Sequence, residues 1–216
     1  MARINELFEF DLAEGNCVIG TDEAGRGSAV GCVFSSAVYF NLIDDELKNA
    51  LKQLNDSKKL SASLRDELYG IIKSKTINST CTNSVEFIEK YNILNASLYA
   101  MKSAVENVTL SVNSDKIIVL VDGFCKIPEL KLKQKCIIKG DSNSASIAAA
   151  SILAKVERDR YMLELDKQYP QYNWKNNMGY LTQDHLDAID KYGLTPLHRS
   201  SFLERYFARK AQLKLF

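Results

Sequence analysis

Four carboxylates follow short apolar segments of the sequence, in positions where they could share metal ions. Asp22 and Glu23 come after CVIGT, Asp122 after KIIVLV, and Asp141 after KCIIKG. Such segments are typical of buried strands, and neighbouring strands can bring acids that are distant in sequence to one edge of a sheet. Crowded carboxylates repel one another, so the group is stable with a bound cation or with raised pKa values. Its expected chemistry is phosphodiester hydrolysis with two divalent ions.

A simpler interpretation is that each acid is a turn residue, because Asp-Gly and Gly-Asp are common in loops. That alternative explains any one of the acids well, but it explains all three strand ends together poorly. Adjacent residues of a strand point to opposite faces. Asp22 and Glu23 can therefore reach one metal only if the chain bends, or if Glu23 offers its backbone carbonyl. Gly25 and Gly27 would supply the freedom to bend.

The composition decides which metal is expected. The chain has two histidines, His185 and His198, and five scattered cysteines without a CxxC pair. Zinc usually requires several closely spaced His or Cys ligands, whereas carboxylates favour Mg²⁺ or Mn²⁺. The cysteines are interpreted as buried thiols in a reducing compartment. For His198 two roles stay open: assistance to the metal or to product release, or a structural hydrogen bond to a loop, which we favour.

With 216 residues, 46% hydrophobic and 25% charged, the chain is expected to form one medium domain. No apolar run approaches 18 residues, and residues 1–9 lack the features of a secretory signal. We therefore expect a monomeric cytoplasmic protein without membrane contact. Residues 1–170 are predicted to form the catalytic domain, and residues 171–216 a helical substrate-binding region packed on it.

The net charge of +1 conceals two halves of opposite sign. Residues 1–122 carry 12 basic and 17 acidic residues, a balance of −5, and residues 123–216 carry 16 and 10, a balance of +6. A basic half could hold a phosphate backbone against an acidic site, although random scatter of surface charge explains the balance about as well. The basic residues predicted to hold a duplex are Lys175, Arg199, Arg205, Arg209 and Lys210.

Hydrophobic patterns predict a mixed α/β fold. The expected strands are Cys17–Thr21 and Val30–Phe40, which form a hairpin, then Thr76–Thr82, Lys116–Val121 and Lys135–Lys139. The expected helices are Asp44–Leu54, Ser61–Lys75, Ser84–Val108 with a break near Asn92–Asn95, Ser144–Gln168, Thr182–Lys191 and Ser200–Gln212. Thr182 is a predicted N-cap, and Ser142, Asn143, Ser144 and Ser146 are interpreted as capping the long helix rather than as phosphate contacts.

Six segments in order resemble the type 2 ribonuclease H family. They are GTDEAGRGSAVGCVFSSAV, DSKKLS, VDG, KGDSNSASIAAASILAKVERDRYM, GYLTQDH and TPLHRSSF. The resemblance covers nearly the whole chain. It departs from the family at Cys32, where proline is usual, and at Asn177-Met178, where His-Lys is more familiar.

This resemblance implies a ribonuclease H-like fold: a mixed sheet flanked by helices, with a small C-terminal helical region. It further implies an endonuclease that cuts 5′ to a ribonucleotide, in RNA–DNA hybrids or in DNA duplexes with embedded ribonucleotides, leaving 3′-hydroxyl and 5′-phosphate ends. Its four metal-binding acids map onto Asp22, Glu23, Asp122 and Asp141.

The resemblance also implies the residues that bind substrate. The glycine turn that senses the ribonucleotide maps onto Gly25, Arg26 and Gly27, and the stacking tyrosine maps onto Tyr180. Of the adjacent Lys58 and Lys59, Lys59 is the better candidate for binding a phosphate, although lysines before a helix are often only solvated.

Two alternatives are weighed against this function. Type 3 ribonuclease H resembles the chain in its acids, but it usually has lysine in place of Arg26 and an added N-terminal region. A non-catalytic binder of RNA–DNA hybrids would gain nothing from four crowded acids facing phosphates.

Overall fold

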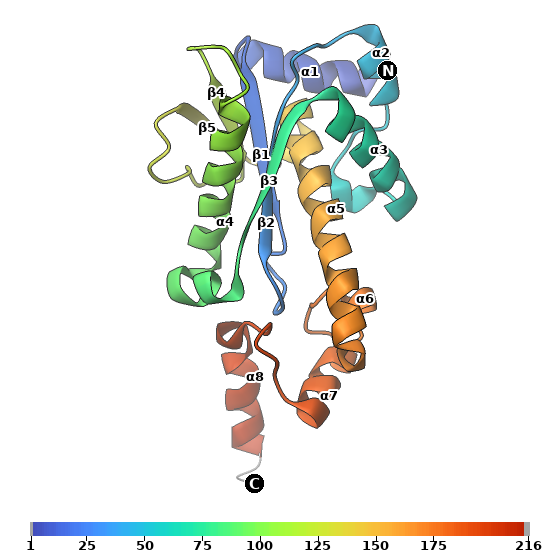
Figure 1. Cartoon of the computed structure of the whole chain (residues 1–216), viewed down its shortest axis with the longest axis vertical. Coiled ribbons are helices and arrows are strands. Elements are labelled where there is room, and N and C mark those ends of the chain that lie inside the picture. Colours follow the sequence, from blue (N-terminus) through green and yellow to red (C-terminus); the bar gives the residue numbers. More distant parts are fainter. Residues whose placement is uncertain (1, 214–216) are drawn as a thin grey trace.

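The computed structural model describes residues 2–213 and is built around a mixed five-stranded sheet (Figure 1). The strand order is β3-β2-β1-β4-β5. β1 pairs antiparallel with β2 and parallel with β4, while β2–β3 is antiparallel and β4–β5 parallel. The strands are β1 (Val18–Ala24), β2 (Val33–Tyr39), β3 (Ile77–Asn83), β4 (Ile118–Asp122) and β5 (Lys133–Ile137).

Helices cover both faces of this sheet, and further helices extend from one end (Figure 1). The α-helices are α1 (Ala2–Glu14), α2 (Asp45–Ala50), α3 (Ala62–Lys75), α4 (Val85–Thr109), α5 (Ala145–Gln168), α6 (Trp174–Asn177), α7 (Gln183–Tyr192) and α8 (Ser200–Leu213). Short 3-10 turns lie at Ser57–Lys59, Gly140–Ser142 and Pro170–Tyr172.

The two faces of the sheet have separate cores. On one face, apolar residues of α1, α2, α3 and the alanine-rich half of α5 pack against β2. On the other, α4 packs against β1 and β4 (Figure 1). α5 lies very close to β1, because a Cβ at Gly20 would fall 2.3 Å from the backbone nitrogen of Ile147. This close approach explains the small residues in the first half of α5.

The C-terminal elements α6 and α7 and the first part of α8 share a third core with the end of α5. This core contains Trp174, Tyr172, Ile189 and Leu203 around Met162. Figure 1 shows α7 and α8 beyond the end of the sheet. Between residues 2 and 213, no helix combines the length and the hydropathy needed to cross a bilayer.

The structure confirms the predicted mixed sheet flanked by helices, the β1–β2 hairpin and a break in α4, where Asn92 has φ 65°. It corrects two strand boundaries and adds two helices. β1 runs through Asp22 and Glu23 instead of ending before them, because these residues pair with Ser36 and Ser35 of β2. β5 ends at Ile137, since Lys139 takes a left-handed conformation with φ 55°. Helices α1 and α6 were not predicted.

Candidate active site

The predicted acids gather at one edge of the sheet, where β4 ends while β1 continues. The pairing of β1 with β4 stops at Thr21, so Asp22 and Glu23 lie just beyond it. Asp122 is the last residue of β4, and its Oδ1 accepts a hydrogen bond of 2.7 Å from the Gly140 backbone N–H. Sheet topology therefore positions these acids, and the Gly140 turn ties β4 to the segment that carries Asp141.

The two adjacent acids of β1 differ in their surroundings. Asp22 is 5% exposed, and its Oδ1 accepts the Glu23 backbone N–H at 2.7 Å. Burial, together with the charges of Glu23 and Asp122, raises the pKa of Asp22 well above its usual range, and the Ser151 hydroxyl offsets this in part. Burial also raises the pKa of Glu23, although the nearby Arg26 opposes the rise.

Asp141 lies in the 3-10 turn after β5 rather than directly at a strand end. Burial and the charges of Asp56 and Asp122 raise its pKa, and Lys58 opposes the rise. Asp122 thus acts electrostatically on Asp22, Glu23 and Asp141 alike. The four sequence-predicted acids form one interacting group, with Asp122 as the common neighbour.

This group fits a divalent cation in its chemistry. Its donors are carboxylate oxygens, which Mg²⁺ and Mn²⁺ prefer. Burial, and after it the charges of neighbouring carboxylates, raises the pKa of Asp22 and Asp141, and a bound cation would favour their charged forms. Among residues 2–213, no three His, Cys, Asp or Glu side chains lie in an arrangement that could hold a metal ion.

The Gly25–Arg26–Gly27 turn lies beside Glu23, and two buried arginines, Arg158 and Arg199, contact it. Gly25 has φ +96°, and a Cβ there would fall 2.2 Å from Nε of Arg158, so no other residue fits without rearrangement. Arg199 Nη1 donates to the carbonyl of Gly25 at 2.8 Å. The Arg26 side chain itself is 41% exposed and lies 3.2 Å from Glu23.

The position of Arg199 corrects one prediction. It was expected to hold a duplex, but it is fully buried and its guanidinium donates to the carbonyls of Gly25, Ser28 and Gly31. Three backbone carbonyls converge on it because the chain bends sharply through this turn. Arg199 is therefore part of the support of the turn and is inaccessible to a phosphate.

Tyr180 lies next to the turn, 46% exposed, with its Cε1 3.3 Å from where a Cβ of Gly27 would be. A side chain at residue 27 would press on the ring. Asn177, one of the departures from the family, holds the preceding bend: its Oδ1 accepts the Gly179 N–H at 2.8 Å, and its Nδ2 donates to the Tyr172 carbonyl. It therefore acts on the conformation before Tyr180.

A cavity of about 400 Å³ joins the turn, Tyr180 and two of the acids, Asp22 and Glu23. Its cationic lining comprises Arg26, Lys58, Arg65, Lys155 and Arg158. Ser151, Lys155 and Arg158 are spaced four and three residues apart on α5, a helical spacing that could have indicated them from the sequence.

Of the two neighbouring lysines, Lys58 lines this cavity. Lys59, which the sequence favoured, is 58% exposed and lies 3.6 Å from Asp56. The outcome for His198 is different: it is 5% exposed, and its Nδ1 accepts the Thr195 N–H at 2.9 Å. This confirms the favoured interpretation of a structural hydrogen bond to a loop.

Comparison with known proteins places the chain in a family. The ribonuclease HII family profile matches residues 19–206. The chain is 44% identical over 201 residues to ribonuclease HII of Caldicellulosiruptor bescii, covering 92% of this chain and 93% of that protein. It is also 44% identical over 202 residues to ribonuclease HII of Fusobacterium nucleatum, covering 93% and 92%.

Solved structures show the same fold. The ribonuclease HII of Archaeoglobus fulgidus, solved in a complex with PCNA, has a TM-score of 0.67 at 24% identity, covering 85% of this chain and 93% of that one. The Bst ribonuclease HIII solved with Mn²⁺ has a TM-score of 0.64 at 17% identity, covering 88% and 65%. The family profile and the curated relatives show that the chain belongs to the ribonuclease HII family of nucleases.

Proposed function

We propose that this protein hydrolyses the phosphodiester on the 5′ side of a ribonucleotide, in RNA–DNA hybrids and in DNA duplexes with embedded ribonucleotides. The observation that carries the proposal is a single cavity that joins Asp22 and Glu23 to the Gly25–Arg26–Gly27 turn and Tyr180. Reactive acids, bare backbone and an aromatic ring meet there, and these are the groups needed to cut a strand beside a recognised sugar.

In the proposed reaction, water attacks the phosphorus atom and the bond from phosphorus to the 3′-oxygen of the preceding nucleotide breaks. The products are a 3′-hydroxyl and a 5′-phosphate on the ribonucleotide. Asp22, Glu23, Asp122 and Asp141 would hold two Mg²⁺ or Mn²⁺ ions. When bound, these ions supply water activation and stabilisation of the leaving oxygen.

Recognition of the ribonucleotide is assigned to the turn. Backbone groups of Gly25, Arg26 and Gly27 can approach a 2′-hydroxyl, since the two glycines have no side chains. A site built to bind a hydroxyl strongly rejects the analogue that lacks it, because its polar groups are left unpaired. Tyr180, which lies against Gly27, would stack on the next sugar where no 2′-hydroxyl blocks it.

Two features favour an enzyme over a non-catalytic binder of hybrids. The buried Asp22 carries a raised pKa, which a passive binding surface would not need. The cationic residues Lys58 and Lys155 line the same cavity, where they can hold phosphates while the acids act.

The test is cleavage of three duplexes that differ in one sugar or one strand: DNA with a single ribonucleotide, an RNA–DNA hybrid, and DNA alone. With Mg²⁺ or Mn²⁺, we expect a cut directly 5′ to the single ribonucleotide and no cut in DNA alone. Tyr180→Ala should lose the preference for the junction, and Tyr180→Phe, which keeps the ring, should retain it. Equal cleavage of DNA alone, or full activity in a chelator, would refute the proposal.

A further inference from the structure

A chain of buried polar rings lies beneath Tyr180 and has no place in the reaction described above. His185 and Trp174 are fully buried, and His198 is 5% exposed. Nε1 of Trp174 donates to Nε2 of His185 at 3.0 Å, and Nε2 of His198 lies 3.3 Å from the same atom. Nδ1 of His185 lies 2.9 Å from the backbone carbonyl of Tyr180.

The partners of His185 fix the position of its proton. A backbone carbonyl only accepts, so Nδ1 of His185 carries the proton and donates to Tyr180. An indole nitrogen only donates, so Nε2 of His185 accepts from Trp174. His185 is therefore a neutral ring that links Trp174 to the backbone of Tyr180 through two hydrogen bonds.

The partners of His198 fix its proton in the same way. Its Nδ1 accepts from the Thr195 backbone N–H at 2.9 Å, so the proton lies on Nε2 and points to Nε2 of His185. A second proton on either ring would place two donors face to face. Burial lowers the pKa of both histidines, that of His198 to about 4, in agreement with two neutral rings.

The two histidines are linked to the two parts of the recognition site. His185 is hydrogen-bonded to the backbone carbonyl of Tyr180. His198 immediately precedes Arg199, whose guanidinium holds the carbonyls of Gly25 and Ser28 at 2.8 and 2.6 Å. The histidine pair thus joins the tyrosine segment to the segment that supports the glycine turn.

We propose that His185 and His198 are positioning residues that fix Tyr180 relative to the Gly25–Arg26–Gly27 turn and so set the preference for a ribonucleotide followed by DNA. This inference rests on the proposed function, because it assigns the histidines to the recognition of that substrate. A purely structural role would stabilise the C-terminal core without acting selectively on substrate choice.

Two variants of His185 separate the positioning role from a purely structural role. One variant keeps only the hydrogen-bond acceptor of His185, and the other keeps only its donor. The Oε1 atom of Gln replaces Nε2, so His185→Gln can still accept from Trp174 and His198 but loses the donor to Tyr180. The Nδ2 atom of Asn replaces Nδ1, so His185→Asn keeps the donor to Tyr180 and leaves the buried donors of Trp174 and His198 unpaired.

The measured quantity is the ratio of kcat/KM for a single ribonucleotide in DNA to kcat/KM for an RNA–DNA hybrid. His185→Gln should lower this ratio by about fivefold, the usual effect of one neutral hydrogen bond, mainly through KM for the junction. His185→Asn should keep the ratio while lowering Tm more than His185→Gln does. If both variants keep the wild-type ratio, or both lose it in proportion to Tm, the positioning role is wrong.

A readout without cleavage keeps this inference separate from the proposed function. The backbone N–H of Tyr180 donates to the Asn177 carbonyl, and its hydrogen exchange should accelerate in His185→Gln and not in His185→Asn. Equal exchange in the two variants would overturn the positioning role. Absence of any junction preference in the wild type would instead refute the proposed function.

If the variants do not fold, the wild-type protein still tests the geometry. ¹⁵N spectra of the histidine rings at pH 7 should show the Nδ1–H form for His185 and the Nε2–H form for His198. The reverse forms, or a protonated cation at either residue, would overturn the inference.

Discussion

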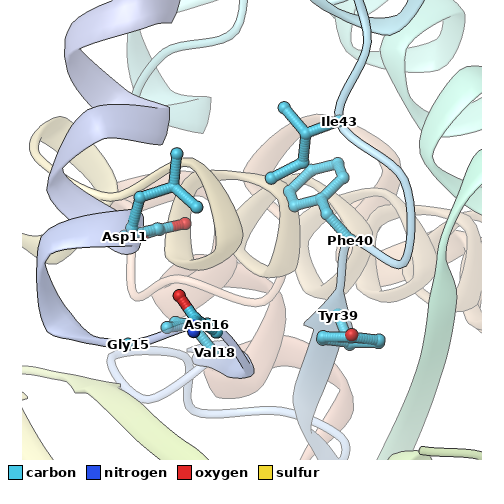
Figure 2. A pocket seen from close by; sticks show the side chains of 8 residues that line it. Asp11, Gly15, Asn16, Val18, Tyr39, Phe40 and Ile43 are labelled. Carbon is cyan, nitrogen blue, oxygen red and sulfur yellow. The ribbon is translucent and has the colours of Figure 1, made fainter.

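Asp11 and His198 are buried groups whose protonation should change the free energy of unfolding in opposite directions. Asp11 lies in α1, is 5% exposed, and accepts the Ser146 backbone N–H at the start of α5 at 2.8 Å. Figure 2 shows Asp11 beside a small cavity bordered by Asn16 and Phe40. The volume of this cavity is about 30 Å³. Within the described residues, its Oδ1 has no hydrogen-bond partner.

For Asp11, burial raises the pKa from 3.8 to about 6. Between these values the folded protein holds a proton that the unfolded chain has released, so stability falls as the pH rises through the window. The difference corresponds to about 3 kcal/mol, fully lost above pH 6. Asp11→Asn removes the titration, so the variant should gain up to about 3 kcal/mol over wild type at pH 7.5 and little at pH 4.

For His198, burial and the neighbouring His185 lower the pKa from 6.5 to about 4. Here the unfolded chain holds a proton that the folded protein lacks, so stability falls as the pH drops from 6.5 to 4, again by about 3 kcal/mol. His198→Asn loses hydrogen bonds at every pH, but it should lose about 3 kcal/mol less than wild type on acidification. The two windows overlap, so the two effects largely cancel in the wild-type protein.

Urea unfolding of wild type and both variants at pH 4, 5, 6 and 7.5 measures these effects, with m-values checked for two-state behaviour. The free energy of unfolding of Asp11→Asn minus that of wild type should become more positive as the pH rises. The free energy of unfolding of His198→Asn minus that of wild type should become more negative as the pH rises. Differences that stay constant with pH for both variants would refute the reasoning from burial.

Two further predictions concern the acids and the basic half. Asp22→Asn should lower the rate of cleavage by orders of magnitude. In a chelator it should raise the free energy of unfolding by about 1–2 kcal/mol, because the substitution removes a buried carboxylate whose pKa is raised. Calorimetry should also show that Mg²⁺ raises Tm more in wild type than in the variant, and a variant less stable than wild type in the chelator would contradict this prediction. The affinity for a duplex should fall steeply between 50 and 200 mM salt. Replacing the exposed Arg205 or Arg209 by Gln should in each case reduce the slope of log affinity against log salt concentration by about one. A slope that neither replacement changes would show that these arginines do not contact the duplex.

Much of the fold was predictable because its signals are local. The apolar segment before Asp122 and the alanine-rich start of α5 each report burial directly in their composition. The end of β1 was not predictable in this way. Asp22 and Glu23 are poor strand formers, and they are held in the strand by pairing with β2, a contact that no local pattern reveals.

In the candidate site, too, only the residues with a local sequence signal could be predicted. The acids could be found from their positions after apolar segments, but the residues that support them could not. Arg158 and Arg199 look like ordinary surface cations in the sequence, and both are almost completely buried. Their roles arise from backbone carbonyls that converge on them, Met178 for Arg158 and Gly25 for Arg199, and such convergence exists only in the folded chain.

Near the Gly25–Arg26–Gly27 turn, the buried arginines and the buried Asp22 carry opposite charges but are not paired with one another. Burial lowers the pKa of Arg199 to about 10, while burial raises the pKa of Asp22. Nε of Arg158 and Nη2 of Arg199 have no hydrogen-bond partner among residues 2–213. The guanidiniums are occupied with backbone carbonyls, so neither neutralises the carboxylates. On the proposed function, divalent ions would compensate the acids, while Lys58 and Lys155 of the same cavity would hold the substrate's phosphates, so the charges of the site are balanced only in the substrate complex.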